Sequence, residues 1–267
     1  MKIKNISIAI SSCPNDIYIF YAILTNKIDT QNIKLNFTIH DIEHLNNLVI
    51  NNSIDIAKIS FAAYPFAIDN YILSNVGSAI TNDGGPLLIG KDNQIHQHQP
   101  KVGIPGKYTT ANLLLSKFFN FNNTVELLFS EIEDKIIDNS IDIGVIIHES
   151  RFSYQNKGLK LITNLGNLWI NKTNLPIPLG GIAINRKIDN NTSKKIQSLI
   201  TKSINYAKQN HNEVVEYAKK FSYIKNNDTI NQHIEMYVNE YTYNLNTSAK
   251  NSIIKLLNIN NNLNIFL

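Results

Sequence analysis

His148 is the residue whose type and position point most directly to chemistry. It follows the apolar run 143–147, which is typical of a buried strand, and it is the first polar side chain past that run. Because histidine titrates near neutral pH, an imidazole at a strand end can serve as a general base. The alternative is a histidine that caps the next helix or satisfies a local backbone group.

Asn15 and Asp16 lie in a second segment of interest, 11–16, which joins an apolar run to an amphipathic one. A loop that leads from the carboxyl end of a strand to a helix N-terminus is where α/β proteins bind ligands, and the helix amides favour an anion. The alternative is that Pro14 shapes a turn and Asn15 or Asp16 caps the helix. Cys13 is not expected to be a nucleophile, because nothing near it in the sequence supplies the base or positive charge that lowers a thiol pKa.

Lys58, Ile59 and Ser60 end a third segment, the expected strand 54–59. A strand end of this kind again points into a ligand cleft, so we take all three as candidate substrate contacts. The alternative is that Ser60 is the N-cap of the following helix and Lys58 is a solvated surface charge.

The turn 103–111, between an expected strand and an expected helix, invites comparison with a phosphate loop. The match fails, because only two residues separate Gly103 from Gly106 and a tyrosine follows the lysine of the loop, where Ser or Thr is required. Nucleoside triphosphate binding is therefore excluded. Thr109 and Thr110, at the helix start, still form a candidate cradle for a small anion through backbone amides and hydroxyls.

The other histidines give weaker signals. His40 and His44 are four residues apart, a spacing that suits a metal only if both lie on one helix. His40 is expected to end a strand, so we expect no metal site there. His211 and His233 fall among the C-terminal helices and are weaker candidates.

Short apolar runs alternate with amphipathic segments over the first two-thirds of the chain, which is the pattern of an α/β protein. The first unit is predicted to contain strands at 5–10, 33–39, 54–59, 71–77 and 87–89 and helices at 16–25, 42–50 and 61–68. The second unit is predicted to contain strands at 101–104, 124–128, 142–147 and 159–162 and helices at 109–120, 131–138 and 149–153. A breaker cluster then precedes a strand at 181–185 and helices at 194–208, 214–221, 229–241 and 248–257.

These elements predict two α/β lobes, the first formed by residues 1–90 and 186–267 and the second by the inserted residues 91–185. The chain would cross between the lobes twice, near 90–100 and near 178–186. This layout resembles the two-lobe periplasmic-binding-protein fold of type 2, with a ligand cleft between the lobes and C-terminal helices.

Composition and charge exclude several classes of protein. Charged residues make up 17% of the 267, and the net charge of +4 comes without a basic block, which argues against a disordered chain and a nucleic-acid-binding arm. This mild positive charge suits an anionic small-molecule substrate. The single cysteine excludes a disulfide framework. No run approaches the ~20 apolar residues of a membrane span, and the alternation of Ile6, Ile8 and Ile10 indicates a strand rather than a signal peptide, so we expect a cytoplasmic protein.

Several segments together resemble the family of 1,4-dihydroxy-6-naphthoate synthases, which act in the futalosine route to menaquinone. The resemblance runs from about Ile8 to the C-terminal helices, in one order and without large gaps. The segments that carry it are 11–18, 58–64, 85–87, 105–111, 146–152, 175–180 and 237–239. Against the family's Ser-Pro-Cys-Pro-Asn-Asp-Thr-Phe signature, this chain departs at Ser12, Ile17 and Tyr18. Ile17 lacks a threonine hydroxyl, which removes one polar contact if that position touches the ligand.

The resemblance implies a lyase that converts cyclic dehypoxanthinylfutalosine into 1,4-dihydroxy-6-naphthoate with release of a sugar-derived fragment. It implies no metal and no organic cofactor. The absence of a basic block and of a long apolar run, noted above, argues against nucleic acid and a membrane as partners. His148 matches the position of the family's base. The matches to its substrate-contact segments are Lys58, Ile59, Ser60, Thr109 and Thr110, and the signature adds Asn15 and Asp16.

Three other functions share this fold. A non-catalytic anion-binding protein would need an export signal, which we do not expect, and would have no use for a base. Chorismate dehydratase, an earlier enzyme of the same pathway, is disfavoured by the segments 13–16 and 148–151. The effector domain of a transcriptional regulator would need a DNA-binding segment, and we expect none before residue 1. The oligomeric state is left open.

Overall fold

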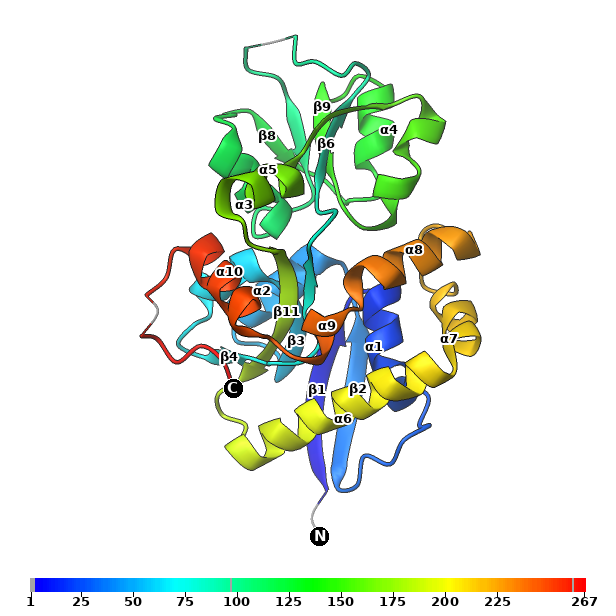
Figure 1. The fold of residues 1–267 in the computed structure, drawn as a ribbon, viewed down its shortest axis with the longest axis vertical. Helices are drawn as coiled ribbons and strands as arrows, with labels where there is room; N and C mark the ends of the chain where they lie inside the picture. Colours follow the sequence, from blue (N-terminus) through cyan, green and yellow to red (C-terminus); the bar gives the residue numbers. More distant parts are fainter. Residues whose placement is uncertain (1–2, 97, 261) are drawn as a thin grey trace.

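The strands of the computed structural model form two mixed sheets, one in each of two lobes (Figure 1). The structure describes residues 3–96, 98–260 and 262–267. The first sheet is built, within these residues, from β1 (Lys4–Ile10), β2 (Ile33–Ile39), β3 (Ile56–Ser60), β4 (Tyr71–Leu73), β5 (Ala79–Thr81) and β11 (Ile177–Asn185). Its order is β2-β1-β3-β11-β4, with β5 also paired to β11. β1 runs parallel to β2 and β3, whereas β11 runs antiparallel to its neighbours.

The second sheet occupies the other lobe, at the top of Figure 1. Its described strands are β6 (Leu87–Gly90), β7 (Val102–Ile104), β8 (Thr124–Glu126), β9 (Ile143–Ile146) and β10 (Lys160–Asn164). Their order is β10-β6-β9-β7-β8, with β7 parallel to β8 and β9 and with β6 antiparallel to β9 and β10. All residues of β6 and β9 are buried, as their uninterrupted apolar sequences predict.

The points at which the chain crosses between the lobes differ from the expected ones. β6 belongs to the second sheet although it precedes the expected boundary at residue 90, and β11 belongs to the first sheet although it precedes the boundary at residue 185. The crossings therefore fall in 82–86 and 174–176. Gly84 and Gly85 both have positive φ, at +113° and +86°, so the glycine turn of the first breaker cluster forms the crossing itself.

The first lobe carries most of the helices in the described part of the chain. These are α1 (Pro14–Leu24), α2 (Ile42–Ile50), the 3-10 helix η1 (Phe61–Phe66), α6 (Asn190–Gln209), α7 (His211–Ala218), α8 (Asn227–Tyr237), α9 (Glu240–Tyr243) and α10 (Thr247–Leu257). α6 buries an apolar stripe with spacings of three and four and packs against α1, which α7 and α8 also contact (Figure 1). No helix among the described residues combines the length and apolarity that crossing a bilayer requires.

The second lobe contains α3 (Thr110–Phe118), η2 (His148–Phe152), η3 (Tyr154–Lys157), α4 (Ile132–Ile137) and α5 (Leu165–Thr173). α5 was not expected from the sequence, although Leu168 and Trp169 follow Leu165 at spacings of three and four. Asn164 caps this helix by accepting hydrogen bonds from the amides of Gly166 and Asn167. Trp169 anchors it, since its buried indole donates to the Pro176 carbonyl at 3.0 Å.

Two expected elements are interrupted in the structure. The expected helix 229–241 divides into α8 and α9, because Asn239 begins a new helix with a capping box. The expected strand 71–77 ends at Leu73, and a turn with Gly77 at φ +86° leads into β5, which the sequence analysis did not anticipate. Polar caps and glycine turns thus override the apolar periodicity at both places.

Parallel pairing places the strand ends that carry candidate site residues at one edge of each sheet. β1 and β3 are parallel, so the start of α1 and the end of β3 at Ser60 lie at one edge of the first sheet. β7 and β9 are parallel, so the start of α3 and His148 lie at one edge of the second sheet. Residues from both edges line the cleft described below.

Candidate active site

One cleft between the lobes gathers every site residue expected from the sequence. It encloses about 650 Å³, including space open to solvent. Its lining includes the expected residues Asn15, Asp16, Lys58, Ile59, Ser60, Thr109, Thr110 and His148. The structure therefore brings the separate sequence segments to one place, while the role of each residue stays a prediction.

His148 follows β9 in a strained backbone conformation. Its φ of +56° lies in the left-handed region, which residues other than glycine rarely adopt. The half-buried ring packs edge-on against Phe129, with ring centroids 4.8 Å apart. Ile147, and not His148, occupies the N-cap position of η2. Such strain persists only where the surroundings hold it, and it is common at functional sites. The fold thus holds the imidazole at the cleft.

The surroundings of His148 favour its neutral form. Burial lowers the pKa of the imidazole below its ordinary value of 6.5, and the charge of Lys58 acts in the same direction. The carboxylates of Glu149, Asp41 and Asp16 partly offset this effect. At neutral pH the ring is therefore mostly unprotonated, and it keeps the lone pair that a general base needs.

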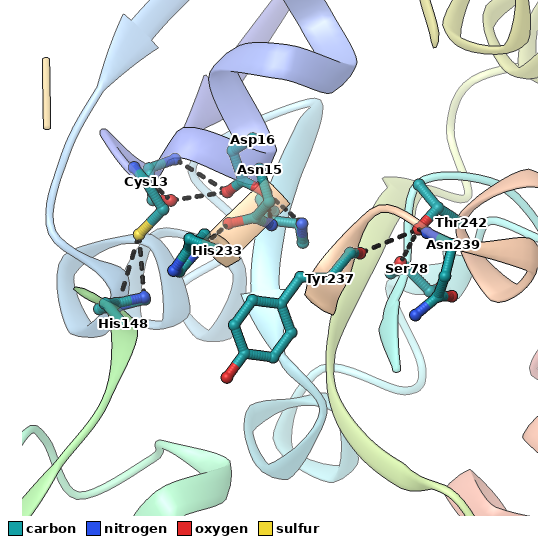
Figure 2. Close-up of polar contacts among 11 residues, drawn as sticks. Cys13, Asn15, Asp16, Ser78, His148, His233, Tyr237, Asn239 and Thr242 are labelled. Atoms are coloured by element: carbon teal, nitrogen blue, oxygen red, sulfur yellow. Dashed lines mark hydrogen bonds and ion pairs between the residues drawn. The ribbon is translucent and has the colours of Figure 1, made fainter. Parts of the chain in front are cut away.

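Cys13 has a neighbour that sequence analysis did not place there. Its Sγ lies 3.0 Å from Nδ1 and 3.5 Å from Nε2 of His148, which is 135 residues away in the chain (Figure 2). Burial, together with the carboxylates of Glu149 and Asp16, raises the pKa of the thiol well above its ordinary value. The thiol therefore stays protonated, which disfavours nucleophilic attack despite the adjacent imidazole. Its contact helps to position the ring of His148.

A chain of buried polar contacts forms the opposite wall of the cleft. Lys58 is ion-paired with Asp16, and their side chains are only 4% and 3% exposed. Asp16 also accepts hydrogen bonds from the Ser11 hydroxyl at 2.6 Å and from Asn15 Nδ2 at 3.0 Å. Asn15 Oδ1 in turn lies 2.9 Å from Nε2 of His233 (Figure 2). The two buried charges are thus paired and hydrogen-bonded, as burial requires.

The structure decides between the interpretations that were open for four residues. α1 begins at Pro14, so Asn15 and Asp16 do not cap it and are available to the network above. Lys58 is buried, so it is not a solvated surface charge. Ser60 occupies the N-cap position of η1 but makes no side-chain capping bond, and it lines the cleft.

Thr109 and Thr110 begin α3 on the second lobe. Thr109 is the N-cap, and its hydroxyl accepts from the Asn112 amide at 3.2 Å and donates to the Gly106 carbonyl at 2.8 Å. The Thr110 hydroxyl donates to the Leu179 carbonyl of β11 at 2.7 Å and so links the two lobes. Because both hydroxyls already donate to backbone carbonyls, an anion here would depend on the first backbone amides of α3.

His233 is a cleft residue that sequence analysis missed. α8 places it on a buried face with Ile230, Ile234 and Tyr237, at spacings of three and four. It is 1% exposed, lines the cleft, and lies with its ring centroid 6.3 Å from that of His148. The sequence did contain a signal, since a histidine within an apolar helical stripe faces the interior rather than the solvent.

His40 and His44 lie together outside this network, with ring centroids 4.4 Å apart. His40 follows β2 and His44 belongs to α2, as expected. Over the described ranges, no group of three or more His, Cys, Asp or Glu side chains is arranged to hold a metal ion.

Solved structures share this fold. A crystal structure of a protein from Archaeoglobus fulgidus is 32% identical, with a TM-score of 0.91 over 95% of this chain and 96% of that one. A ligand-binding component of an ABC-type import system from Staphylococcus aureus is 14% identical, with a TM-score of 0.71 over 96% and 91%. A Candida albicans protein described as having the generic periplasmic binding protein fold is also 14% identical, with a TM-score of 0.69 over 96% and 90%. The predicted two-lobe fold is therefore confirmed.

Sequence comparison gives the family. Two proteins named "1,4-dihydroxy-6-naphtoate synthase" are each 29% identical to this chain. The Thermus thermophilus protein aligns over 92% of this chain and 90% of its own length, and the Streptomyces coelicolor protein over 96% and 93%. A family model described as menaquinone biosynthesis matches residues 6–261. Because that match spans nearly the whole chain, the protein belongs to the menaquinone biosynthesis family.

Proposed function

We propose that the protein is a lyase that converts cyclic dehypoxanthinylfutalosine into 1,4-dihydroxy-6-naphthoate, with His148 as the base. The observation that carries the proposal is the His148 imidazole, on backbone with positive φ, in a cleft between the lobes that a buried ion pair also lines. Burial lowers the pKa of this imidazole and so favours its neutral form. The names of the two relatives support the identity of the product. No metal and no organic cofactor takes part in the proposed reaction.

The proposed reaction begins with removal of a proton by His148. A carbon next to the substrate ketone is acidic, because the electron pair left behind spreads onto the oxygen as an enolate. His148 takes the proton, and return of the enolate electrons expels the sugar-derived fragment. Aromatisation of the naphthoate ring then drives the elimination forward. The lowered pKa of His148 suits this step, since the ring is unprotonated before it acts.

The N-terminus of α3 is better placed than Lys58 to hold the substrate carboxylate. Lys58 already neutralises Asp16, which weakens its attraction for a second anion. The first turn of α3 lines the cleft at Thr110 and Ala111, where helix amides carry partial positive charge. We therefore assign the carboxylate to α3 and assign Lys58 to holding Asp16 in place.

Hydrogen bonds between the lobes close the cleft around this chemistry. Glu43 of the first lobe accepts from the Tyr108 amide of the second lobe at 2.8 Å. Glu149 of the second lobe accepts from the Ser222 hydroxyl of the first lobe at 2.7 Å. Closure of this kind excludes water and strengthens electrostatic interactions inside the site.

Turnover by the purified protein tests the proposal. The parent chain, His148→Ala and His96→Ala are each incubated with cyclic dehypoxanthinylfutalosine, and 1,4-dihydroxy-6-naphthoate is detected by mass. We expect product from the parent chain and at least ~100-fold less from His148→Ala, because general-base catalysis typically contributes about 10²–10⁴. His96 is exposed, at 65% of its side chain, so His96→Ala should match the parent chain.

The outcomes separate the reaction from the base. A folded parent chain that makes no product would overturn the proposed reaction, and chorismate would be tried next, because the family description names the pathway and not the step. Product formation that is unimpaired in His148→Ala would keep the reaction and overturn the base.

A further inference from the structure

His233 is a buried histidine in the cleft for which the proposed reaction has no role. Its side chain is 1% exposed and lines the cleft. Its Nδ1 atom is buried and has no hydrogen-bond partner among the described residues. A buried polar atom without a partner is costly, so such an atom in a binding cleft points to a ligand that supplies the partner.

Asn15 determines which nitrogen of His233 carries the proton. Asn15 Nδ2 donates to Asp16 at 3.0 Å, so the carbonyl oxygen of Asn15 is the atom turned toward His233. That oxygen only accepts, so Nε2 of His233, 2.9 Å away, donates to it. In the neutral ring Nδ1 then keeps its lone pair. Burial lowers the pKa of His233 to about 4, so the ring is neutral at physiological pH.

The surroundings of His233 hold its ring in place. Figure 2 shows the ring between Asn15 and His148, with its second nitrogen turned away from Asn15. Tyr237 packs on the ring, with centroids 4.7 Å apart. Asp16 is itself held by Lys58, so the chain of contacts behind Asn15 is firm.

We propose that His233 is a second substrate contact, whose Nδ1 accepts a hydrogen bond from a hydroxyl group of the substrate. This inference rests on the proposed function, in which the sugar-derived part of the substrate carries hydroxyl groups. A lone pair attracts a hydroxyl and repels a carboxylate, so the ligand group is a donor. Because the ring of His148 is 6.3 Å away, centroid to centroid, this bond orients the substrate close to the proton that His148 removes.

Two amide substitutions separate this role from a structural one. In His233→Asn the amide reaches the position of Nδ1, where its oxygen can still accept from the substrate, but it no longer reaches Asn15. In His233→Gln the amide reaches the position of Nε2 and keeps the bond to Asn15, but it offers no acceptor at the position of Nδ1. A substrate contact is therefore restored by asparagine, and a purely structural bridge is restored by glutamine.

The measurements are kcat, KM and Tm for the parent chain and both variants, with cyclic dehypoxanthinylfutalosine as substrate. We expect His233→Gln to keep the parent's Tm and to lower kcat/KM by about 10- to 100-fold, as loss of one buried hydrogen bond predicts. His233→Asn should keep most of kcat/KM in spite of a lower Tm. The reverse order, with glutamine active and asparagine impaired, would overturn the substrate contact. A parent chain without turnover would overturn the proposed function, and this inference with it.

Discussion

The two walls of the cleft differ in where their supporting contacts come from. On the first lobe, Lys58, Asp16, Asn15 and His233 are linked to one another by an ion pair and hydrogen bonds that all lie within that lobe. None of these contacts involves a residue of the second lobe. The first wall is therefore preorganised, since its charges do not have to rearrange when a substrate arrives.

The second wall depends on the first. His148 is held by Phe129 of its own lobe and by Cys13 of the other lobe. Burial lowers its pKa, and its contact with Cys13 crosses from one lobe to the other. Closure of the cleft therefore positions the base and favours its neutral form in the proposed reaction.

Breaking the ion pair of the first wall should have the largest effect on stability. In Lys58→Met the Asp16 carboxylate stays buried without its cation, and removal of one partner of a buried pair typically costs 3–5 kcal/mol. We expect a loss of about 3 kcal/mol in the free energy of unfolding, because Ser11 and Asn15 still hydrogen-bond to Asp16. Urea denaturation at pH 7 measures this loss.

A surface pair provides the matched control for that experiment. Lys187 lies 3.2 Å from Asp55, with the lysine side chain 62% exposed. Lys187→Met should therefore cost less than about 1 kcal/mol. If Lys58→Met and Lys187→Met lose equal free energy of unfolding, burial does not make the pair of Lys58 and Asp16 more important for stability than a surface pair.

The sequence predicts the residues of each wall of the cleft but not the contacts between the walls. The strand end at His148 and the segments at Asn15, Lys58 and Thr109 were found because apolar runs mark strands, and strand ends in α/β folds mark clefts. The juxtaposition of Cys13 with His148 was not predictable, because the two residues lie on different lobes and meet only where the lobes pack together. Local patterns identify each wall, whereas contacts between the walls need the three-dimensional structure.

His233 and α5 were missed for more local reasons. The sequence predicts His233 only to be a weaker candidate among the C-terminal helices, although Ile230, Ile234 and Tyr237 place it on a buried helical stripe. α5 is short, and its apolar residues with helical spacing, Leu165, Leu168 and Trp169, span only its first turns, beginning next to the cap at Asn164. Periodicity analysis is thus weakest where polar groups are buried or where the apolar pattern of a helix is short.

The stability of the protein should depend on pH through His233 of the first wall. Burial lowers the pKa of His233 to about 4, whereas an unfolded histidine titrates near pH 6.5. Below pH 6.5 His233 becomes protonated in the unfolded chain but stays neutral in the folded chain. Stability that is present above pH 6.5 is therefore lost as the pH falls. Between pH 7 and pH 4.5 this loss is roughly 2 to 3 kcal/mol.

The variant His233→Asn isolates this contribution, because asparagine does not titrate. Urea denaturation at pH 7 and pH 4.5 should show a smaller loss of stability in the variant than in the parent chain. Identical losses in the two proteins would mean that His233 is not held neutral by the first wall.

The smallest expected effect is that of a substitution at Thr109, the N-cap of α3 in the second lobe. Thr109→Ala removes the N-cap of α3 and should cost about 1 kcal/mol of stability. If the first amides of α3 hold the substrate carboxylate, the frayed turn should also raise KM a few-fold. Asn164→Ala removes the cap of α5 in the same lobe, and Asn164 lies outside the cleft lining formed by the described residues. That control should lose similar stability with an unchanged KM, because α3 lines the cleft and the described residues of α5 do not. An equal rise of KM in both variants would instead indicate general loosening of the second lobe, and the carboxylate would then be reassigned to Lys58.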